Sequence, residues 1–264
     1  MKIQDIYIYP IKSLGGIRLQ EAEVQTKGLK WDRRWMLVDE HGIFLSQRSL
    51  HHMALLQVDI ETDGLKVFLK NKPDNNIYIP FEPETKDFIQ VQVWEDRLLG
   101  QIVSPIANQW FSEILNINCQ LIFMPESSLR PVEEKYTVNN ETVSFADAMP
   151  YLLIGQGSLD ELNSRLDNPV PMERFRPNLV FSGGAAFQED QWTHIQIGDC
   201  SFKVTKPCAR CVLTTVDQNT GIKGKEPLKT LSTYRRKDNK VLFGQNLISL
   251  KNGTVKVGDK LIIK

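Results

Sequence analysis

The sequence has no excess of charge of either sign. Its 264 residues include 32 Lys and Arg and 32 Asp and Glu, which gives a formal net charge of +0. A balanced chain has no global electric field that would attract nucleic acid or an anionic membrane. We therefore expect no stable nucleic-acid binding, and any anion site must be local.

Cysteine and long apolar runs are also scarce. The four cysteines are too few for a disulfide scaffold at this length, which favours a reducing, cytoplasmic setting. No stretch approaches the roughly 18 apolar residues of a membrane-spanning helix. Asp5 interrupts the N-terminus before the apolar core of a signal peptide could form. We expect neither a signal peptide nor a membrane span.

What the first half does contain is the period-2 alternation of apolar and polar residues that is typical of β-strands. One helix is predicted, over 108–115, where the apolar residues follow helical spacing. The polar stretch 126–142 is expected to be a linker or long loop. The expected strands of this half are 3–9, 35–38, 43–45, 56–60, 65–69, 77–79, 88–94 and 121–123.

The second half continues the β pattern. A second helix is predicted over 159–166, and two helices do not alternate with the strands as a doubly wound parallel sheet requires. The sequence therefore predicts a mainly β protein with a few short helices and two domains, 1–124 and 125–264. The expected strands here are 151–154, 178–181, 193–197, 201–205, 212–216, 242–250 and 254–263.

The pair Cys208 and Cys211, in Lys-Pro-Cys-Ala-Arg-Cys, is the strongest local signal. A thioredoxin-type pair would begin a helix, whereas β-branched residues follow here and predict that Cys211 lies where a loop enters a strand. Zinc would need further ligands, and no companion spacing supplies them. Two structural thiols remain an alternative. Lys206 and Arg210 place positive charge beside the sulfurs, which favours a thiolate, a soft metal ligand.

Gly155-Gln156-Gly157-Ser158 follows a predicted strand and precedes a predicted helix, the context of a dinucleotide-binding loop. Asp160 replaces the third glycine of that fingerprint, however. Ser158 and Glu161 have the spacing of a capping box, so a capped helix explains the segment.

Basic residues form three further clusters, at Lys12-Ser13, at Arg33-Arg34 and at Arg174 with Arg176. Taken singly, each cluster is typical of a solvated surface. Nothing in composition or spacing joins them.

Seven short motifs lie at 9–13, 32–35, 175–178, 206–217, 225–228, 243–245 and 257–259. They occur in the order found in MOSC-domain proteins, and in this the chain resembles the mitochondrial amidoxime-reducing component and its bacterial relatives. The resemblance covers nearly the whole chain and implies an N-terminal MOSC β-barrel domain followed by a MOSC β-barrel domain.

The resemblance also implies a molybdenum cofactor, in which a molybdopterin binds the metal through dithiolene sulfurs. The family's metal ligand falls on Cys211, and the acidic residue near the metal falls on Asp147. Arg210 is a further candidate contact because its charge lies beside Cys211. Where close relatives carry hydroxyl side chains, this chain has Ala148 and Met149. The family's cofactor contacts fall on Lys12, Ser13, Arg33, Arg176 and Asn178.

By the same resemblance the chain is a molybdenum-dependent oxidoreductase that reduces N-hydroxylated compounds. A small amidoxime, hydroxylamine or N-hydroxylated base is then the substrate, with Cys211 and Asp147 as catalytic residues. The chain has no dinucleotide fingerprint and too few cysteines for an iron–sulfur site. We therefore expect electrons from a separate flavin reductase, haem or iron–sulfur protein. A persulfide sulfur carrier and a cofactor storage protein remain alternatives.

Overall fold

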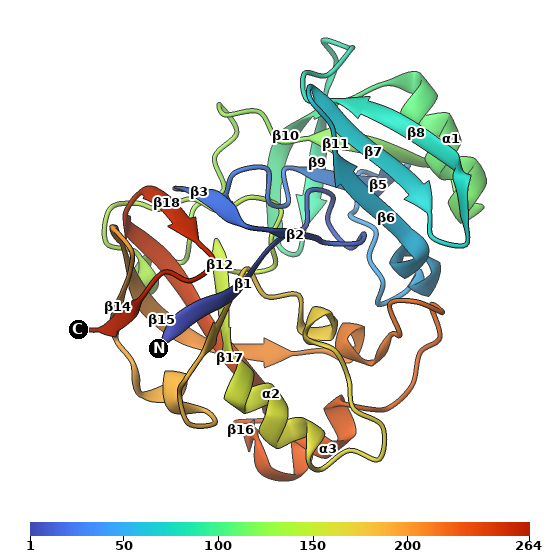
Figure 1. Cartoon of the computed structure of the whole chain (residues 1–264). Coiled ribbons are helices and arrows are strands. Elements are labelled where there is room, and N and C mark those ends of the chain that lie inside the picture. Colours follow the sequence, from blue (N-terminus) through green and yellow to red (C-terminus); the bar gives the residue numbers. More distant parts are fainter.

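The structure, a computed structural model, describes residues 1–264 and is built mainly from β-strands (Figure 1). The helices are α1 (Pro105–Leu115), α2 (Gln156–Asn163) and α3 (Leu228–Tyr234). Five short 3₁₀ helices are η1 (His51–Leu55), η2 (Glu134–Tyr136), η3 (Met172–Phe175), η4 (Gln188–Gln191) and η5 (Val212–Thr215). The strands are β1 (Lys2–Ile8), β2 (Ile17–Leu19), β3 (Glu21–Gln25), β4 (Gly28–Leu29), β5 (Trp35–Asp39), β6 (Leu56–Ile60), β7 (Gly64–Leu69), β8 (Lys72–Pro80), β9 (Phe88–Val93), β10 (Asp96–Ile102), β11 (Cys119–Phe123), β12 (Tyr151–Gly155), β13 (Leu179–Ser182), β14 (His194–Ile197), β15 (Cys200–Arg210), β16 (Arg236–Lys237), β17 (Lys240–Lys251), β18 (Gly253–Lys256) and β19 (Leu261–Ile263).

The largest sheet joins the two ends of the chain. Its strands follow the order β19-β14-β15-β17-β12-β13-β1-β2, so the first strand lies among strands of the second half. β1 pairs antiparallel with β13, with Ile6 opposite Leu179. Eighteen buried residues form the core beside this sheet, and they include Ile3, Ile6 and Ile8 from β1. The N-terminal strand is therefore part of the second lobe, as Figure 1 shows.

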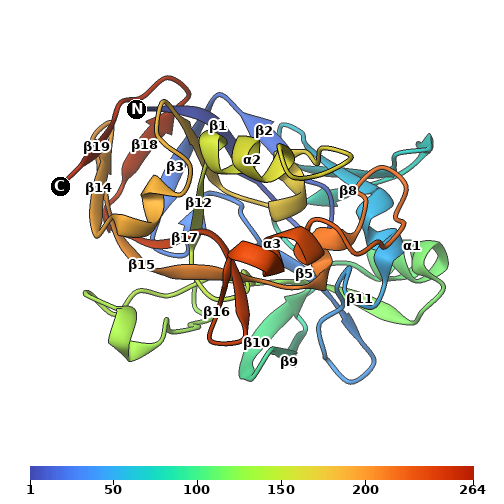
Figure 2. The same ribbon diagram turned by 90° about the horizontal axis from the view of Figure 1, so that it is seen from below.

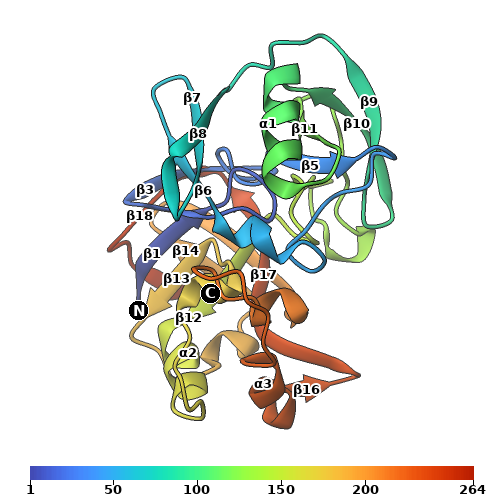
Figure 3. The same cartoon turned by 90° about the vertical axis from the view of Figure 1, so that its right-hand side faces the viewer.

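The first lobe contains two smaller sheets, β5-β11-β10-β9 and β6-β7-β8. Helix α1 covers them on one side, as Figure 3 shows. Phe111 of α1 belongs to a core of 16 buried residues that also contains Trp35. A third small sheet, β18-β3-β4, pairs the end of the chain with the segment after β2.

The prediction of a mainly β protein without a doubly wound sheet is confirmed, because only β12 and β13 pair in parallel. The closed barrels implied by the resemblance are not formed. The outermost strands of the large sheet, β2 and β19, have three residues each and do not pair with each other. Closure requires a continuous hydrogen-bonded stagger between the edge strands, which strands this short do not provide.

Local predictions differ from the structure in several places. The predicted strand 43–45 forms only isolated bridges, and the predicted strand 254–263 is divided into β18 and β19 by a turn. Residues 212–215 form η5 instead of the predicted strand, because backbone N–H groups bond to carbonyls three residues back, as from Thr214 to Cys211 at 3.2 Å. Helix α2 begins at Gln156, and Ser158 does not cap it because its hydroxyl bonds to the buried Glu189 carboxylate at 2.8 Å. Among the α-helices and strands, the elements without a prediction are helix α3 and strands β2, β3, β4, β10 and β16.

The two lobes meet where the chain leaves β1. The backbone N–H of Lys12 donates to the carbonyl of Trp35 at 2.8 Å, and that of Arg33 donates to the carbonyl of Tyr9 at 2.9 Å. Helix α3 lies at the end of the second lobe away from β5 and β11, as the front view in Figure 1 and the view from below in Figure 2 show together. The boundary between the two domains near residue 125 stays a prediction.

The structure has no helix whose length and apolar character would let it cross a membrane.

Candidate functional site

A cavity of ≈ 500 Å³ lies between the lobes, with 28 residues around it. Contributions come from the segment after β1, the 146–149 loop, the end of η3 and the end of β15. The three basic clusters that spacing could not join therefore meet here. Arg34 and Arg174 lie outside the cavity, where Arg34 pairs with Glu126 and Arg174 with Asp217. All eight predicted site residues line the cavity: Lys12, Ser13, Arg33, Asp147, Arg176, Asn178, Arg210 and Cys211.

The cavity wall is strongly cationic although the whole chain is neutral. Among its lining residues are eight Lys and Arg but only two Asp and no Glu. Like charges held this close repel one another, and an anion between them relieves the repulsion. The wall is therefore suited to a ligand with several negative charges.

Two arginines that line the cavity lie against the same aromatic ring. The guanidinium carbons of Arg33 and Arg176 lie 4.3 Å and 4.1 Å from the ring centroid of Tyr9, which is buried. The electron-rich face of the ring attracts both cations and fixes their planes. Tyr9 thereby holds two like charges near each other in one orientation.

Arg176 has an unused hydrogen-bond donor. Its Nη1 donates to the carbonyl of Leu14 at 2.7 Å, whereas its buried Nη2 has no partner. Burial, together with the positive charge of Arg33, lowers the pKa of Arg176 to about 10. A buried donor without a partner costs roughly 1–3 kcal/mol. A group that accepts from Nη2 would remove this cost.

Arg33 is held in place by its neighbours. Its Nη1 lies 2.8 Å and 2.7 Å from the two carboxylate oxygens of buried Asp32, and its Nη2 donates to the carbonyl of Arg176 at 3.0 Å. Asp32 also accepts from the backbone N–H of Tyr9 at 2.8 Å. The arginine cannot swing out of the cavity without breaking these bonds.

The backbone around the cavity adopts conformations that side-chain-bearing residues seldom take. Ser13, Arg33 and Arg176 have φ of 67°, 50° and 53°, in the left-handed region. Each such residue costs on the order of 1 kcal/mol or more. Three of them on one cavity wall are typical of a functional site, where strain is kept because it directs groups at a ligand.

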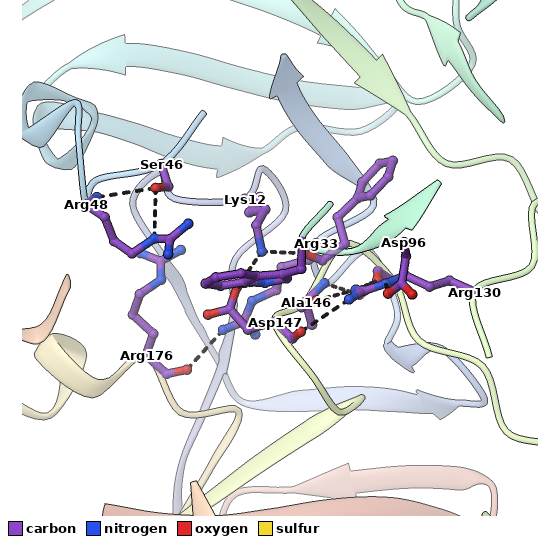
Figure 4. Close-up of polar contacts among 12 residues, drawn as sticks. Lys12, Arg33, Ser46, Arg48, Asp96, Arg130, Ala146, Asp147 and Arg176 are labelled. Atoms are coloured by element: carbon purple, nitrogen blue, oxygen red, sulfur yellow. Dashed lines mark hydrogen bonds and ion pairs between the residues drawn. The ribbon is translucent and has the colours of Figure 1, made fainter. Parts of the chain in front are cut away.

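Lys12 and Asp147 form an ion pair on the cavity wall, with 2.6 Å between Nζ and Oδ1 (Figure 4). Lys12 also donates to the carbonyl of Phe145 at 2.7 Å. Burial lowers the pKa of Lys12 to about 8. Partial desolvation on the cavity wall tends to raise the pKa of Asp147, but the Lys12 ammonium outweighs this effect and holds that pKa well below its usual range. The proton of this pair therefore resides on Lys12 at neutral pH.

Arg130, which the sequence analysis missed, fixes the loop that carries Asp147. Its Nη1 donates to the carbonyls of Ser144 and Ala146, its Nη2 donates to that of Asp147 at 3.2 Å, and its Nε pairs with Asp96 at 2.7 Å (Figure 4). The side chain is buried although it comes from the predicted loop 126–142. No motif surrounds Arg130, so only the fold reveals this role.

Arg48 lines the cavity but has no sequence signal. Its guanidinium carbon lies 4.0 Å from the ring centroid of Trp94 and 5.3 Å from that of Phe44. Its Nε donates to the hydroxyl of Ser46 at 3.3 Å (Figure 4). Arg48 thus supplies a cation, stacked on aromatic rings, that belongs to none of the three basic clusters.

The two cysteines differ in what surrounds their sulfurs. Cys208 accepts a hydrogen bond from Nη1 of Arg210 at 2.9 Å and packs against the apolar cluster around Phe175. Cys211 lies between the end of β15 and the start of η5, so a strand leads into a turn here, the reverse of the expected order. Both residues are half-buried and line the cavity. Arg210 is engaged with Cys208 and, at 2.7 Å, with the carbonyl of Phe175.

The remaining predicted residues brace the cavity or border it. Asn178 donates to the carbonyl of Tyr7 and accepts from the N–H of Leu152, both at 3.2 Å, so its amide ties β1 to β12. Ala148 is exposed and Met149 is buried, and both line the cavity without a hydroxyl group.

Comparison with known proteins gives matches over nearly the whole chain. Residues 1–118 match the MOSC N-terminal beta barrel domain, and residues 140–262 match the MOSC domain. The mitochondrial amidoxime-reducing component 1 of Mus musculus is 34% identical, with 99% of this chain and 82% of that protein covered. The molybdenum cofactor sulfurase of Oryza sativa subsp. japonica is 31% identical over 92% of this chain but only 32% of its own length. The crystal structure of the YUAD protein from Bacillus subtilis matches 98% of this chain and 93% of that chain with 10% identity and a TM-score of 0.44.

Proposed function

Since the chain belongs to the MOSC-domain family, with an N-terminal MOSC domain and a MOSC domain, we propose that it binds the molybdenum cofactor in the cavity between its lobes. We further propose that it reduces N-hydroxylated compounds with electrons from a separate protein. Relatives that are 30–34% identical to it are named amidoxime-reducing components.

The observation that carries the proposal is the unpartnered Nη2 of Arg176 in a cavity lined by eight Lys and Arg. The phosphate of a molybdopterin is a dianion that accepts several charge-assisted hydrogen bonds. Arg176 and Lys12 are buried, and Arg33 is fixed by Asp32, so these donors need little reordering to bind a phosphate. The residues present fit the cofactor's anionic end.

The cysteine sulfurs of the cavity fit the end of the cofactor that carries the molybdenum. A thiolate is a soft ligand, as molybdenum bound by dithiolene sulfurs requires. Cys211 offers a half-buried thiol on the cavity wall, and Cys208 is occupied by Arg210. We assign Cys211 as the metal ligand and Cys208 as a neighbouring structural thiol. The bound cofactor would supply the two-electron redox change.

The protein's own part in the reaction concerns protons. Reduction of an N–OH group to N–H takes up two electrons and two protons and releases water. Asp147 is ionised, so the proton that leaves with the hydroxyl is held on Lys12 Nζ, whose pKa of about 8 lies near the working pH. Asp147 touches Nζ and is 60% exposed toward the cavity, which places it to pass that proton on.

Turnover with an artificial electron donor tests this function. Protein made in cells that produce the cofactor is mixed with an aryl amidoxime and a reduced viologen dye, and the amidine formed is quantified. We expect dye-dependent reduction, and none with NADH or NADPH alone. A molybdenum-loaded sample that fails with the dye favours a storage protein. A sample without molybdenum that carries a persulfide on Cys211 favours a sulfur carrier, the activity suggested by the name of the rice relative.

A further inference from the structure

The positive charge of this neutral chain is concentrated in one segment near its C-terminus. Residues 223–240 contain seven Lys and Arg but only two Asp and Glu, whereas the rest of the chain contains 25 and 30. Helix α3 and strand β16 lie in this segment, at one end of the second lobe, as Figures 1 and 3 show.

Most of this charge is free for a partner. Arg235 pairs with Asp190 at 2.6 Å, but the other six cations of the segment are exposed and form no ion pair. The carboxylate of Glu226 accepts from the backbone N–H of Thr230 at 2.9 Å. We call the six residues the basic surface: Lys223, Lys225, Lys229, Arg236, Lys237 and Lys240.

The basic surface is continuous with the proposed metal site. Lys237 and Lys240 line the cavity. Helix α3 packs against η5, the turn that starts directly after Cys211, and the N–H of Gly224 donates to the carbonyl of Thr215 in that turn at 2.9 Å. A protein seated on the basic surface would therefore lie next to the turn that follows Cys211.

Exposed apolar side chains accompany the charges. Val212, the residue after Cys211, is 40% exposed, and Ile222, beside Lys223, is 69% exposed. An apolar centre with a charged rim is the usual composition of a protein–protein interface.

We propose that the basic surface docks an acidic electron-transfer protein. This rests on the proposed function, in which each N–OH reduction consumes two electrons that a reduced flavin, haem or iron–sulfur protein delivers and is oxidised in doing so. Opposite charges on the two proteins raise the association rate, while a small interface lets the oxidised partner leave. The fold thus provides charge at the place where electrons must enter.

Charge reversal with a matched control tests the docking. The test variant carries Lys225→Glu, Lys229→Glu and Arg236→Glu, none of which lines the cavity. The control carries Lys72→Glu, Lys86→Glu and Arg97→Glu, which reverse three exposed cations of the first lobe. Each holoprotein is driven by a zwitterionic viologen dye or by plant-type ferredoxin, an acidic iron–sulfur protein kept reduced by its reductase. Binding of the ferredoxin is measured separately by calorimetry.

We expect the test variant to lose at least tenfold in ferredoxin binding and ferredoxin-driven rate and to keep its dye-driven rate. The control variant should keep its ferredoxin binding, its ferredoxin-driven rate and its dye-driven rate. In the wild type, the ferredoxin-driven rate should fall several-fold between about 20 mM and about 300 mM salt, because salt screens the attraction between the two proteins. Equal ferredoxin binding by the two variants, or no ferredoxin binding by the wild type, would overturn the docking surface. Failure of the dye-driven reaction in the wild type counts against the proposed function instead, and the binding measurement still decides the docking.

Discussion

At the scale of single residues, the two cysteines of the cavity should separate in function. Cys211→Ser removes the proposed metal ligand and should reduce turnover by at least a hundredfold. Cys208→Ser exchanges a thiol that accepts one hydrogen bond from Arg210, and serine can accept the same bond. We expect this variant to keep most of its activity. The activity of each variant is measured as dye-driven turnover per bound molybdenum. An equal loss in the two variants would contradict the assignment of Cys211 as the metal ligand.

Lys12 predicts a pH dependence of anion binding. Its pKa of about 8 means that its charge is present below pH 8 and is lost as the pH rises through that value, so the affinity for an anion should fall there. Inorganic phosphate binding to the cofactor-free protein, followed from about pH 7.5 to about 9, measures this. Replacing both cavity cysteines with serine beforehand removes thiol titration. Lys12→Gln should bind more weakly and show no decrease; a decrease of equal size would rule out Lys12 as its source.

The sequence predicted which residues belong to the site only where a recognisable motif surrounded them. Lys12, Arg33 and Arg176 lie in short motifs, and the structure brings them to one cavity. Arg48 and Arg130 have no such surroundings, and their roles arise from stacking on Trp94 and from backbone carbonyls of a distant loop. Such contacts depend on tertiary packing, which single-sequence patterns do not contain.

At the scale of elements, the loop that carries Asp147 depends on Arg130. Arg130→Met leaves buried carbonyls of Ser144 and Ala146 without their donor, which should lower the free energy of unfolding by roughly 2 kcal/mol. Urea denaturation measures the loss, and hydrogen exchange should increase at residues 144–147. Arg97→Met, at an exposed position of β10, serves as the control. If hydrogen exchange at residues 144–147 were as slow in the Arg130 variant as in the wild type, the loop would not depend on Arg130 for its stability.

Elements with a clear period were predicted well, and exceptions have local causes. The strands β1, β6 and β7 begin and end within one residue of the strands predicted from alternation. Val212–Thr215 has strand-forming residues, but the hydroxyls of Thr214 and Thr215 bond back to the carbonyls of Cys211 and Val212, and a turn results. Ser158 matches a capping box but bonds to Glu189, which is distant in sequence. In both cases a specific hydrogen bond outweighs propensity.

At the scale of the whole molecule, the cavity depends on the way the chain connects its lobes. β1 lies in the sheet of the second lobe, and the segment after it passes directly to the first. Lys12 and Arg33 therefore reach the same cavity as Arg176 and Cys211. Composition and periodicity predicted the β class but not this arrangement, because strand order depends on long-range pairing.

The measurement that tests the central claim most directly is the molybdenum and pterin content of Arg176→Met and of Arg174→Met. Arg176 faces the cavity with an unpartnered donor, whereas Arg174 pairs with Asp217 outside it. Loss of a buried charge partner costs roughly 2–5 kcal/mol. The account predicts one cofactor per chain in the wild type and in Arg174→Met, and a folded Arg176→Met depleted at least tenfold. Full occupancy of Arg176→Met, or a wild-type protein without molybdenum from cells that make the cofactor, would contradict it.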